Sequence, residues 1–140
     1  DGDVVRNLLH NNLGFSREDI RKNNRLIAEL AKKQLNTYDF ILVPIISPYK
    51  QDRIMARNVI GSDNFIELFV KTPLEECIAR DPKGLYKKAL SGKIENFIGI
   101  SDSNPYEEPD CAEIEVDTST DLPEEVVIKI FRYLTSNIKN

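Results

Sequence analysis

The sequence is poor in the residues that several common kinds of site require. Among its 140 residues are one histidine, two cysteines and no tryptophan. No Ser/His/Asp arrangement surrounds His10, and we interpret it as a surface residue of a helix. Cys77 and Cys111 show no metal-ligand spacing, so we expect free thiols rather than a disulfide or a metal centre. Free thiols are the usual state in a reducing compartment, and we therefore expect a cytoplasmic protein.

Long apolar runs and a strong charge of one sign are also missing. The longest apolar run extends from Phe40 to Ile46, well short of the ~20 residues that span a bilayer. The formal net charge is −4, which gives no bulk attraction to nucleic acid. We therefore expect no membrane and no nucleic acid polymer among the partners. Any anion site has to be a local cluster of cations.

Helical and extended patterns alternate along the chain. Apolar spacing predicts helices at residues 3–11, 16–35, 51–60, 74–79, 85–90 and from 123 onward, and strands at 38–46, 65–70 and 112–116. Strands separated by helices predict an α/β fold in which a parallel sheet has helices on both faces. No linker interrupts the pattern, and we expect residues 1–140 to form a single domain.

Some elements have patterns specific enough to predict their surroundings. The continuous apolar run Tyr38–Ile46 is typical of a strand that is covered on both faces. Ser16 and Asp19 have capping-box spacing, which predicts the start of the second helix. The expected apolar face of that helix consists of Ile20, Ile27, Leu30 and Ala31. Pro123 opens the final helix. Its expected buried side consists of Val126, Val127, Ile130, Phe131 and Leu134.

The segment from Arg80 to Lys88 combines four cations with a break at Pro82 and Gly84. Charged runs usually form a solvated loop. A rigid turn with mobile positive charge also suits a lid over a phosphorylated nucleotide, because closure excludes water and places charge against transferring phosphoryl oxygens. The remaining motifs decide between these two interpretations.

An ordered set of short motifs favours the lid. The motifs are Asp1-Gly2-Asp3 with Arg6, Leu13-Gly14-Phe15-Ser16, Asn23, Ile46-Ser47-Pro48-Tyr49 with Asp52-Arg53, Asp81-Pro82-Lys83-Gly84-Leu85-Tyr86-Lys87-Lys88, Asn96-Phe97, Gly99-Ile100 and Pro105-Tyr106-Glu107. Through them, from residue 1 to about 120, the chain resembles the adenylylsulfate kinase family.

The resemblance implies a P-loop NTPase-like kinase fold with ATP and Mg²⁺ as cofactors. The implied substrate is a small nucleotide, adenosine 5′-phosphosulfate (APS). The implied reaction transfers the γ-phosphoryl group of ATP to the 3′-hydroxyl of APS and gives 3′-phospho-APS (PAPS), a step of sulfate assimilation. A homodimer is a further expectation from the family.

Asp3 and Arg6 carry two of the implied roles. Taken alone, an aspartate at this place is more often a helix cap. The resemblance implies that Asp3 acts in catalysis, either by holding Mg²⁺ through water or by accepting the proton of an attacking hydroxyl. Arg6 lies one helical turn later and is implied to bind the phosphosulfate in bidentate fashion. The plain alternative is a solvent-facing arginine.

The substrate pocket is implied to contain five further residues. Phe15 and Phe97 would sandwich the substrate adenine, although most phenylalanines are simply core residues. The resemblance places Asn23, Ile46 and Ser47 in the same pocket. We do not interpret Ser47 as a covalent nucleophile, because no base accompanies it.

The resemblance implies that different lid cations serve the two nucleotides. Lys83 would reach the acceptor and take part in catalysis, whereas Arg80 would lie on the ATP side. Thr118 lies near the loop that packs on the ATP adenine in related kinases. Asp52 and Arg53 leave two arrangements open: they pair with each other, or Arg53 lines the pocket.

One family motif does not occur in this chain. There is no Gly-x-x-x-x-Gly-Lys-Ser/Thr, and the six glycines are scattered singly. In the family this phosphate-binding loop precedes the Asp-Gly-Asp motif, and it holds the ATP phosphates and Mg²⁺. We expect it within about 25–35 residues upstream of Asp1 in the parent protein. Residues 1–140 alone are therefore expected to be inactive.

A second departure concerns the choice of acceptor. Ile20 stands where the family has a substrate-binding arginine, and Ile98 stands where it has threonine. Arg21 is rotated by ~100° from Ile20 on a helix, while Arg17, one turn earlier, offers partial compensation. The sequence therefore leaves a second acceptor open, cytidine diphosphoramidate, which related kinases of capsule biosynthesis use. A non-catalytic kinase-like domain is a third interpretation.

Overall fold

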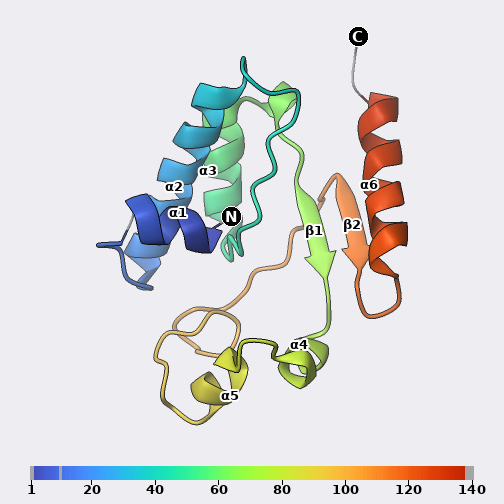
Figure 1. Cartoon of the computed structure of the whole chain (residues 1–140). Coiled ribbons are helices and arrows are strands. Elements are labelled where there is room, and N and C mark those ends of the chain that lie inside the picture. Colours follow the sequence, from blue (N-terminus) through green and yellow to red (C-terminus); the bar gives the residue numbers. More distant parts are fainter. Residues whose placement is uncertain (1, 10, 138–140) are drawn as a thin grey trace. The chain divides into compact units, whose positions relative to one another are not determined.

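The computed structural model describes residues 2–9 and 11–137, so the expectations for Asp1 and His10 lie outside the described residues. Its elements, in chain order, are α1 (Gly2–Leu9), α2 (Arg17–Gln34), α3 (Lys50–Ile60), the 3₁₀ helix η1 (Ser62–Asn64), β1 (Leu68–Lys71), α4 (Leu74–Arg80), α5 (Leu85–Leu90), β2 (Ile114–Asp117) and α6 (Pro123–Asn137) (Figure 1). Contacts divide the chain into two compact units. Unit 1 contains residues 1–65 and 88–108, and unit 2 contains residues 66–87 and 109–140.

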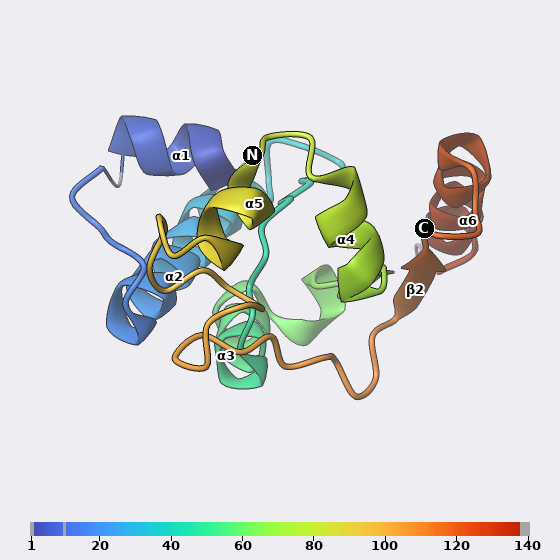
Figure 2. The ribbon, with the colours of Figure 1, turned by 90° about the horizontal axis from the view of Figure 1, so that it is seen from below.

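Helices α2 and α3 pack against each other in unit 1 (Figure 2). Ser16 caps α2 as predicted: its hydroxyl oxygen accepts from the Asp19 amide at 3.1 Å, and the hydroxyl donates to the Asp19 carboxylate at 2.8 Å. The buried residues of α2 are Ile20, Asn23, Asn24, Ile27, Ala28 and Ala31. This spacing is that of one helical face. The predicted face is therefore confirmed except at Leu30, which is 37% exposed.

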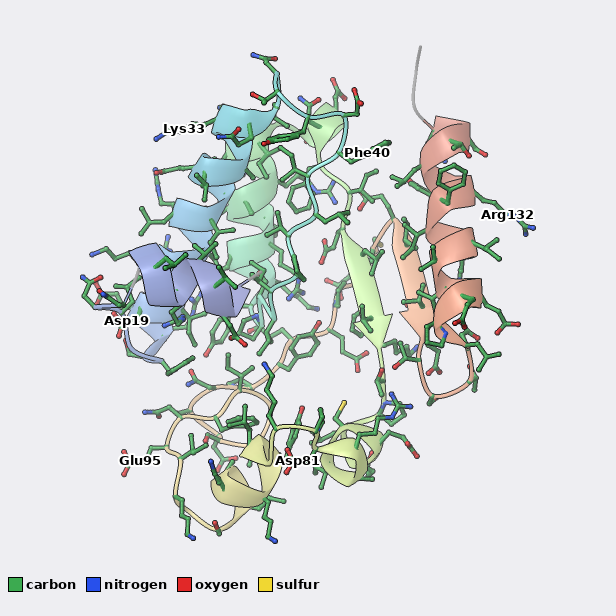
Figure 3. All side chains as sticks on the ribbon, in the orientation of Figure 1. Asp19, Lys33, Phe40, Asp81, Glu95 and Arg132 are labelled. Atoms are coloured by element: carbon green, nitrogen blue, oxygen red, sulfur yellow. The ribbon has the colours of Figure 1, made fainter. Side chains whose placement is uncertain are left out.

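The strand predicted at residues 38–46 is wrong. Within the described residues this segment joins no sheet, and two of its side chains, Phe40 and Leu42, are 51% and 81% exposed. Figure 3 labels Phe40 on this extended segment. An apolar run shows only that burial would be favourable, whereas a strand also needs neighbours that complete its backbone hydrogen bonds. Here the Pro44 carbonyl accepts from the amide of Gly2, a helical residue, at 3.2 Å.

Strands β1 and β2 form a parallel ladder in unit 2. Their register runs from Leu68 opposite Ile114 to Lys71 opposite Asp117. Helix α6 lies beside β2 (Figure 1), and the Lys129 ammonium donates to the Glu115 carbonyl at 2.6 Å. Parallel strands with helices between them along the chain confirm the predicted α/β class.

The predicted buried side of α6 is too wide. Val126, Ile130 and Leu134 are half-buried, but Val127 and Phe131 are 63% and 65% exposed. Successive helical residues project about 100° apart, so the i, i+4, i+8 row packs inward while its neighbours turn toward solvent. Of the helices in the described residues, none is long and apolar enough to cross a membrane.

Candidate functional site

The predicted site residues are shared between the two units. Unit 1 contains Asp3, Arg6, Phe15, Asn23, Ile46, Ser47 and Phe97, and unit 2 contains Arg80, Lys83 and Thr118. Within each unit the contacts of these residues show what holds them in place.

Helix α1 places Asp3 and Arg6 one turn apart. Asp3 lies in the first turn, and its side chain is exposed. Arg6 reaches the loop before α2, where its Nη1 donates to the carbonyls of Leu13 at 3.0 Å and Gly14 at 2.7 Å. Its guanidinium also lies 4.4 Å from the centre of the Phe15 ring, which is 53% exposed. The structure thus brings two predicted substrate residues together as a cation beside an accessible aromatic surface.

Ser47 has an unusual backbone conformation just before α3. Its φ of +42° lies in the left-handed region, which costs a residue other than glycine about 1–3 kcal/mol. Two neighbours hold it: Arg53 Nη1 donates to the Ser47 carbonyl at 2.9 Å, and the Asn24 amide donates to its hydroxyl at 3.4 Å. Asn23 is buried beside Asn24 in sequence, whereas Ile46 is 61% exposed. The segment at Ser47 is therefore fixed by α2 and α3.

Asp52 pairs with Arg17, so of the two arrangements that the sequence left open, the pairing of Asp52 with Arg53 is not the one found. Arg17 Nη1 and Nη2 donate to the two oxygens of Asp52 at 2.7 and 3.0 Å. Arg53 instead donates to the carbonyls of Ser47 at 2.9 Å and Glu107 at 2.8 Å. Adjacent residues on a helix do not face each other, which is why neighbours in sequence take different partners here.

The contacts of Arg17 bear on the substitution at Ile20. The Arg17 guanidinium is held by both oxygens of Asp52 and lies 3.8 Å from the centre of the Tyr49 ring. Ile20 is 3% exposed and belongs to the core face of α2. In this structure Arg17 therefore stabilises unit 1, and the compensation expected from it stays a prediction.

The loop between α5 and β2 contributes a buried polar residue that no motif indicated. Asn104 is 1% exposed, and its amide oxygen accepts from the Tyr49 hydroxyl at 2.7 Å. Its amide nitrogen donates to the carbonyls of Phe15 at 2.9 Å and Asn96 at 2.7 Å. A single asparagine in a polar loop gives no signal in one sequence, because most such residues are solvated.

The carboxyl ends of β1 and β2 bring together Arg80 and Thr118 in unit 2. Arg80 Nη1 donates to the Thr118 hydroxyl at 3.1 Å, and Nη2 donates to the Thr118 carbonyl at 2.8 Å. The Thr72 and Thr118 hydroxyls lie 2.5 Å apart. Next to them, the hydroxyl and amide of Ser119 donate to Asp117 and lower the pKa of that carboxyl. This is the edge of a parallel sheet at which ligands bind.

Asp81 organises the turn that carries Lys83. Its carboxylate accepts from the amides of Tyr86 and Lys87, each at 3.0 Å. These bonds, chiefly that from Lys87, hold the pKa of Asp81 below its usual range. Gly84 has a φ of +64°, and its amide donates to the Asp81 carbonyl at 2.9 Å. The exposed Lys83 side chain therefore extends from a turn whose backbone is held by hydrogen bonds to Asp81.

Replacing Asp81 with alanine should loosen this turn. Both amides lose their acceptor, so hydrogen-exchange protection at Tyr86 and Lys87 is expected to fall to nearly that of an unstructured peptide. The wild-type turn should weaken in the same way in acid. A carboxyl whose pKa is lowered by folding stabilises the fold above its unfolded pKa, and that contribution is lost as the pH falls through the folded pKa.

The measurement is amide exchange in the full-length protein, followed by NMR as protection factors. Asp102→Ala, at an exposed aspartate of the loop after α5, is the matched control and should leave both amides unchanged. Unaltered protection in Asp81→Ala would show that the carboxylate does not hold the turn.

Sequence comparison relates the whole chain to known proteins. The family model for adenylylsulphate kinase matches residues 1–117. The chain is 50% identical over 137 residues to an adenylyl-sulfate kinase of Pseudomonas aeruginosa, which covers 98% of this chain and 69% of that protein. It is 48% identical over 134 residues to an adenylyl-sulfate kinase of Staphylococcus epidermidis, which covers 96% of this chain and 66% of that protein. The chain thus spans about two thirds of the length of these curated relatives.

Structural comparison gives a similar result. The fold is similar to that of the Mycobacterium tuberculosis APS kinase CysC, solved in complex with AMPPNP and APS. The TM-score is 0.88 at 36% sequence identity, and the match covers 96% of this chain and 78% of that one. The chain therefore shares its fold with a kinase that was solved with two bound nucleotides.

Proposed function

Because the chain belongs to the adenylylsulfate kinase family, we propose that its protein transfers the γ-phosphoryl group of ATP to the 3′-hydroxyl of APS. The observation that carries this proposal is the match, at a TM-score of 0.88, to a kinase solved with AMPPNP and APS. The contact of Arg6 with the exposed Phe15 ring supports it. A cation beside a flat ring suits a purine nucleotide with an anionic tail.

The acceptor is proposed to bind in unit 1. Phe15 and Phe97 would stack on the adenine, and such stacking contributes ~1–3 kcal/mol per base. Arg6 supplies positive charge beside Phe15 for the phosphosulfate. The held backbone of Ser47 and the buried Asn23 offer polar contacts to the nucleotide, and the exposed Ile46 offers an apolar one. The support for this pocket is that the backbones of Phe15 and of Asn96, the residue before Phe97, are tied together through Asn104.

Asp3 is proposed to accept the proton of the 3′-hydroxyl as the hydroxyl oxygen attacks the γ-phosphorus and ADP leaves. Its exposed place in the first turn of α1 leaves the carboxylate accessible to a substrate. Lys83 would place charge against the transferring phosphoryl oxygens. Arg80 and Thr118 would act on the ATP side, and their mutual hydrogen bonds at the sheet edge support a shared role.

Mg²⁺ is a proposed cofactor, and in the alternative to proton acceptance Asp3 is the residue that would hold it through a water. In the described part of the chain, no three His, Cys, Asp or Glu side chains gather into a metal site. A single exposed carboxylate suits an ion that arrives with ATP, because Mg²⁺ is usually held by one or two carboxylates, substrate phosphates and waters. The ion would supply neutralisation of charge on the phosphoryl oxygens. The sequence contains no glycine-rich phosphate loop, so the residues that we assign belong mostly to the acceptor pocket and the lid, and only Arg80 and Thr118 are assigned to ATP.

The test is acceptor-dependent turnover by the full-length protein. ATP and APS are expected to give ADP and PAPS in equal amounts, which ion-exchange chromatography separates. Turnover with cytidine diphosphoramidate but not with APS would overturn the choice of acceptor. Turnover with neither would favour a non-catalytic kinase-like domain.

Cytidine diphosphoramidate is kept as a second acceptor because of Ile20. That side chain is buried at 3% exposure, and Arg17 is held by Asp52 one turn earlier. Neither residue therefore supplies a free cation on this face of α2. The terminal amino group of that acceptor donates hydrogen bonds where a sulfate oxygen only accepts them, so a face of α2 without a free arginine suits it better than it suits a sulfate.

Lys83→Ala should impair the reaction through the lid. We expect kcat/KM for APS to fall about 10²-fold, because a charge aimed at the reacting phosphoryl group is lost. Steady-state kinetics of the full-length protein measure this. Lys93→Ala, at an exposed lysine after α5, is the matched control and should behave as wild type. Equal kinetics of the two variants would mean that the Arg80–Lys88 segment is a solvated loop.

A further inference from the structure

Both polar atoms of the Asn104 side chain have hydrogen-bond partners inside unit 1. An asparagine side chain has a carbonyl acceptor and two N–H donors. The Tyr49 hydroxyl donates to the acceptor at 2.7 Å, and the two donors go to the carbonyls of Phe15 and Asn96 at 2.9 and 2.7 Å. A tyrosine hydroxyl is protonated at neutral pH, and burial raises the pKa of Tyr49 further. The opposite amide orientation would set an oxygen against two carbonyl oxygens, so these partners fix how Asn104 lies.

The loop around Asn104 is braced by its own hydrogen bonds. The Phe97 carbonyl accepts from the amides of Ile100 at 3.2 Å and Ser101 at 2.9 Å. The backbone amide of Asn104 donates to the Ser101 carbonyl at 2.9 Å, and the backbone carbonyl of Asn104 accepts from the Gly99 amide at 2.9 Å. After α5 this segment returns to the residues that precede α2 and α3, where the Asn104 side chain bonds to Phe15 and Tyr49. Residues 97–104 therefore form a compact loop that its own backbone hydrogen bonds stabilise.

Asn96, the residue before Phe97, has an unusual backbone conformation that the loop holds in place. Its φ of +56° lies in the left-handed region, which an asparagine tolerates better than most residues. Ser103 donates to the Asn96 side chain at 2.9 Å, and Asn104 donates to the Asn96 carbonyl. The bond to that carbonyl fixes the peptide group that enters Phe97. The other amide N–H fixes the carbonyl of Phe15.

We propose that Asn104 is a positioning residue for the acceptor nucleotide: it clamps the backbone at Phe15 and at the entry to Phe97, and so sets the separation of the two rings. This inference rests on the proposed function, in which both rings stack on the adenine. A stacked base needs both rings in place at once, and a shift of either one loses contact area with the base. Asn104 acts through the two loops and does not itself touch the nucleotide.

Asn104→Asp is the sharpest variant. It keeps the size of the side chain and the acceptor for Tyr49, but it puts a carboxylate oxygen against the carbonyls of Phe15 and Asn96. We expect KM for APS to rise about tenfold, as for a lost stacking contact, while KM for ATP changes by less than about twofold. Tyr49→Phe is the matched variant, because it removes only the donor to the Asn104 oxygen. It should raise KM for APS by no more than about twofold.

The experiment is steady-state kinetics of the full-length protein with each nucleotide varied in turn. Thermal unfolding of each variant checks that it is folded. If Asn104→Asp does not fold, Asn104→Ser keeps one donor, and an intermediate rise in KM for APS alone would support the inference. A parallel rise of both KM values, or a loss of stability with unchanged KM values, would overturn it and leave Asn104 as a brace of the fold only. Failure of the wild-type protein to use APS at all would instead refute the proposed function, and this inference with it.

Discussion

Replacement of Asp3 by asparagine is expected to lower kcat about 10²–10⁴-fold, with KM for APS changed by less than about threefold. Asparagine preserves the shape of the side chain and its ability to accept a hydrogen bond, but it cannot take up the proton of the 3′-hydroxyl. Asp3 lies in the first turn of α1.

The measurement is initial-rate kinetics with saturating ATP and varied APS. Asp63→Asn, at an exposed aspartate in η1, is the control and should leave kcat unchanged. If Asp3 only complements the positive end of α1, its replacement would cost about 0.3–1 kcal/mol of stability and leave the rate intact. A variant with normal kcat would therefore remove Asp3 from the catalytic step.

Elements with local signals were predicted from the sequence. The cap of α2 depends on Ser16 and Asp19, three residues apart, and the structure confirms it. The turn at Gly84 depends on a residue that tolerates a positive φ, and the start of α6 at Pro123 depends on a residue whose φ is fixed. The strand at 38–46 failed because pairing is not local. Leu42, 81% exposed, shows that apolar character does not supply a neighbouring strand.

Site contacts that join distant positions could not be predicted in this way. Arg17 and Asp52 are 35 positions apart, and Asn104 and Phe15 are 89 positions apart. Nothing in the local sequence of either partner specifies the other. For Asp52 the neighbouring Arg53 offered an incorrect partner, because proximity in sequence is not proximity on a helix surface. The family resemblance indicated which residues belong to a pocket, but not which residues hold them there.

Arg17→Met should destabilise the protein more than Asp52→Asn does. The first change leaves a carboxylate, 1% exposed, without the guanidinium bonds at 2.7 and 3.0 Å. Breaking a buried pair costs ~3–5 kcal/mol, and we expect about 3 kcal/mol because Asp52 lies in the first turn of α3, where the helix dipole favours negative charge. Asp52→Asn leaves an arginine that is 39% exposed and can return to water, so we expect about 1–2 kcal/mol.

Urea unfolding of the full-length variants tests this order. Arg25→Met breaks an exposed pair with Glu29, whose side chains are 62% and 44% exposed, and should cost no more than about 0.5 kcal/mol. The Arg17→Met/Asp52→Asn double variant should lose less than the sum of the single losses, because a neutral side chain no longer needs the guanidinium. A loss for Arg17→Met no greater than that for Arg25→Met would contradict the structural role of the pair. Arg17 would then be available to bind the acceptor in place of the arginine that Ile20 replaces.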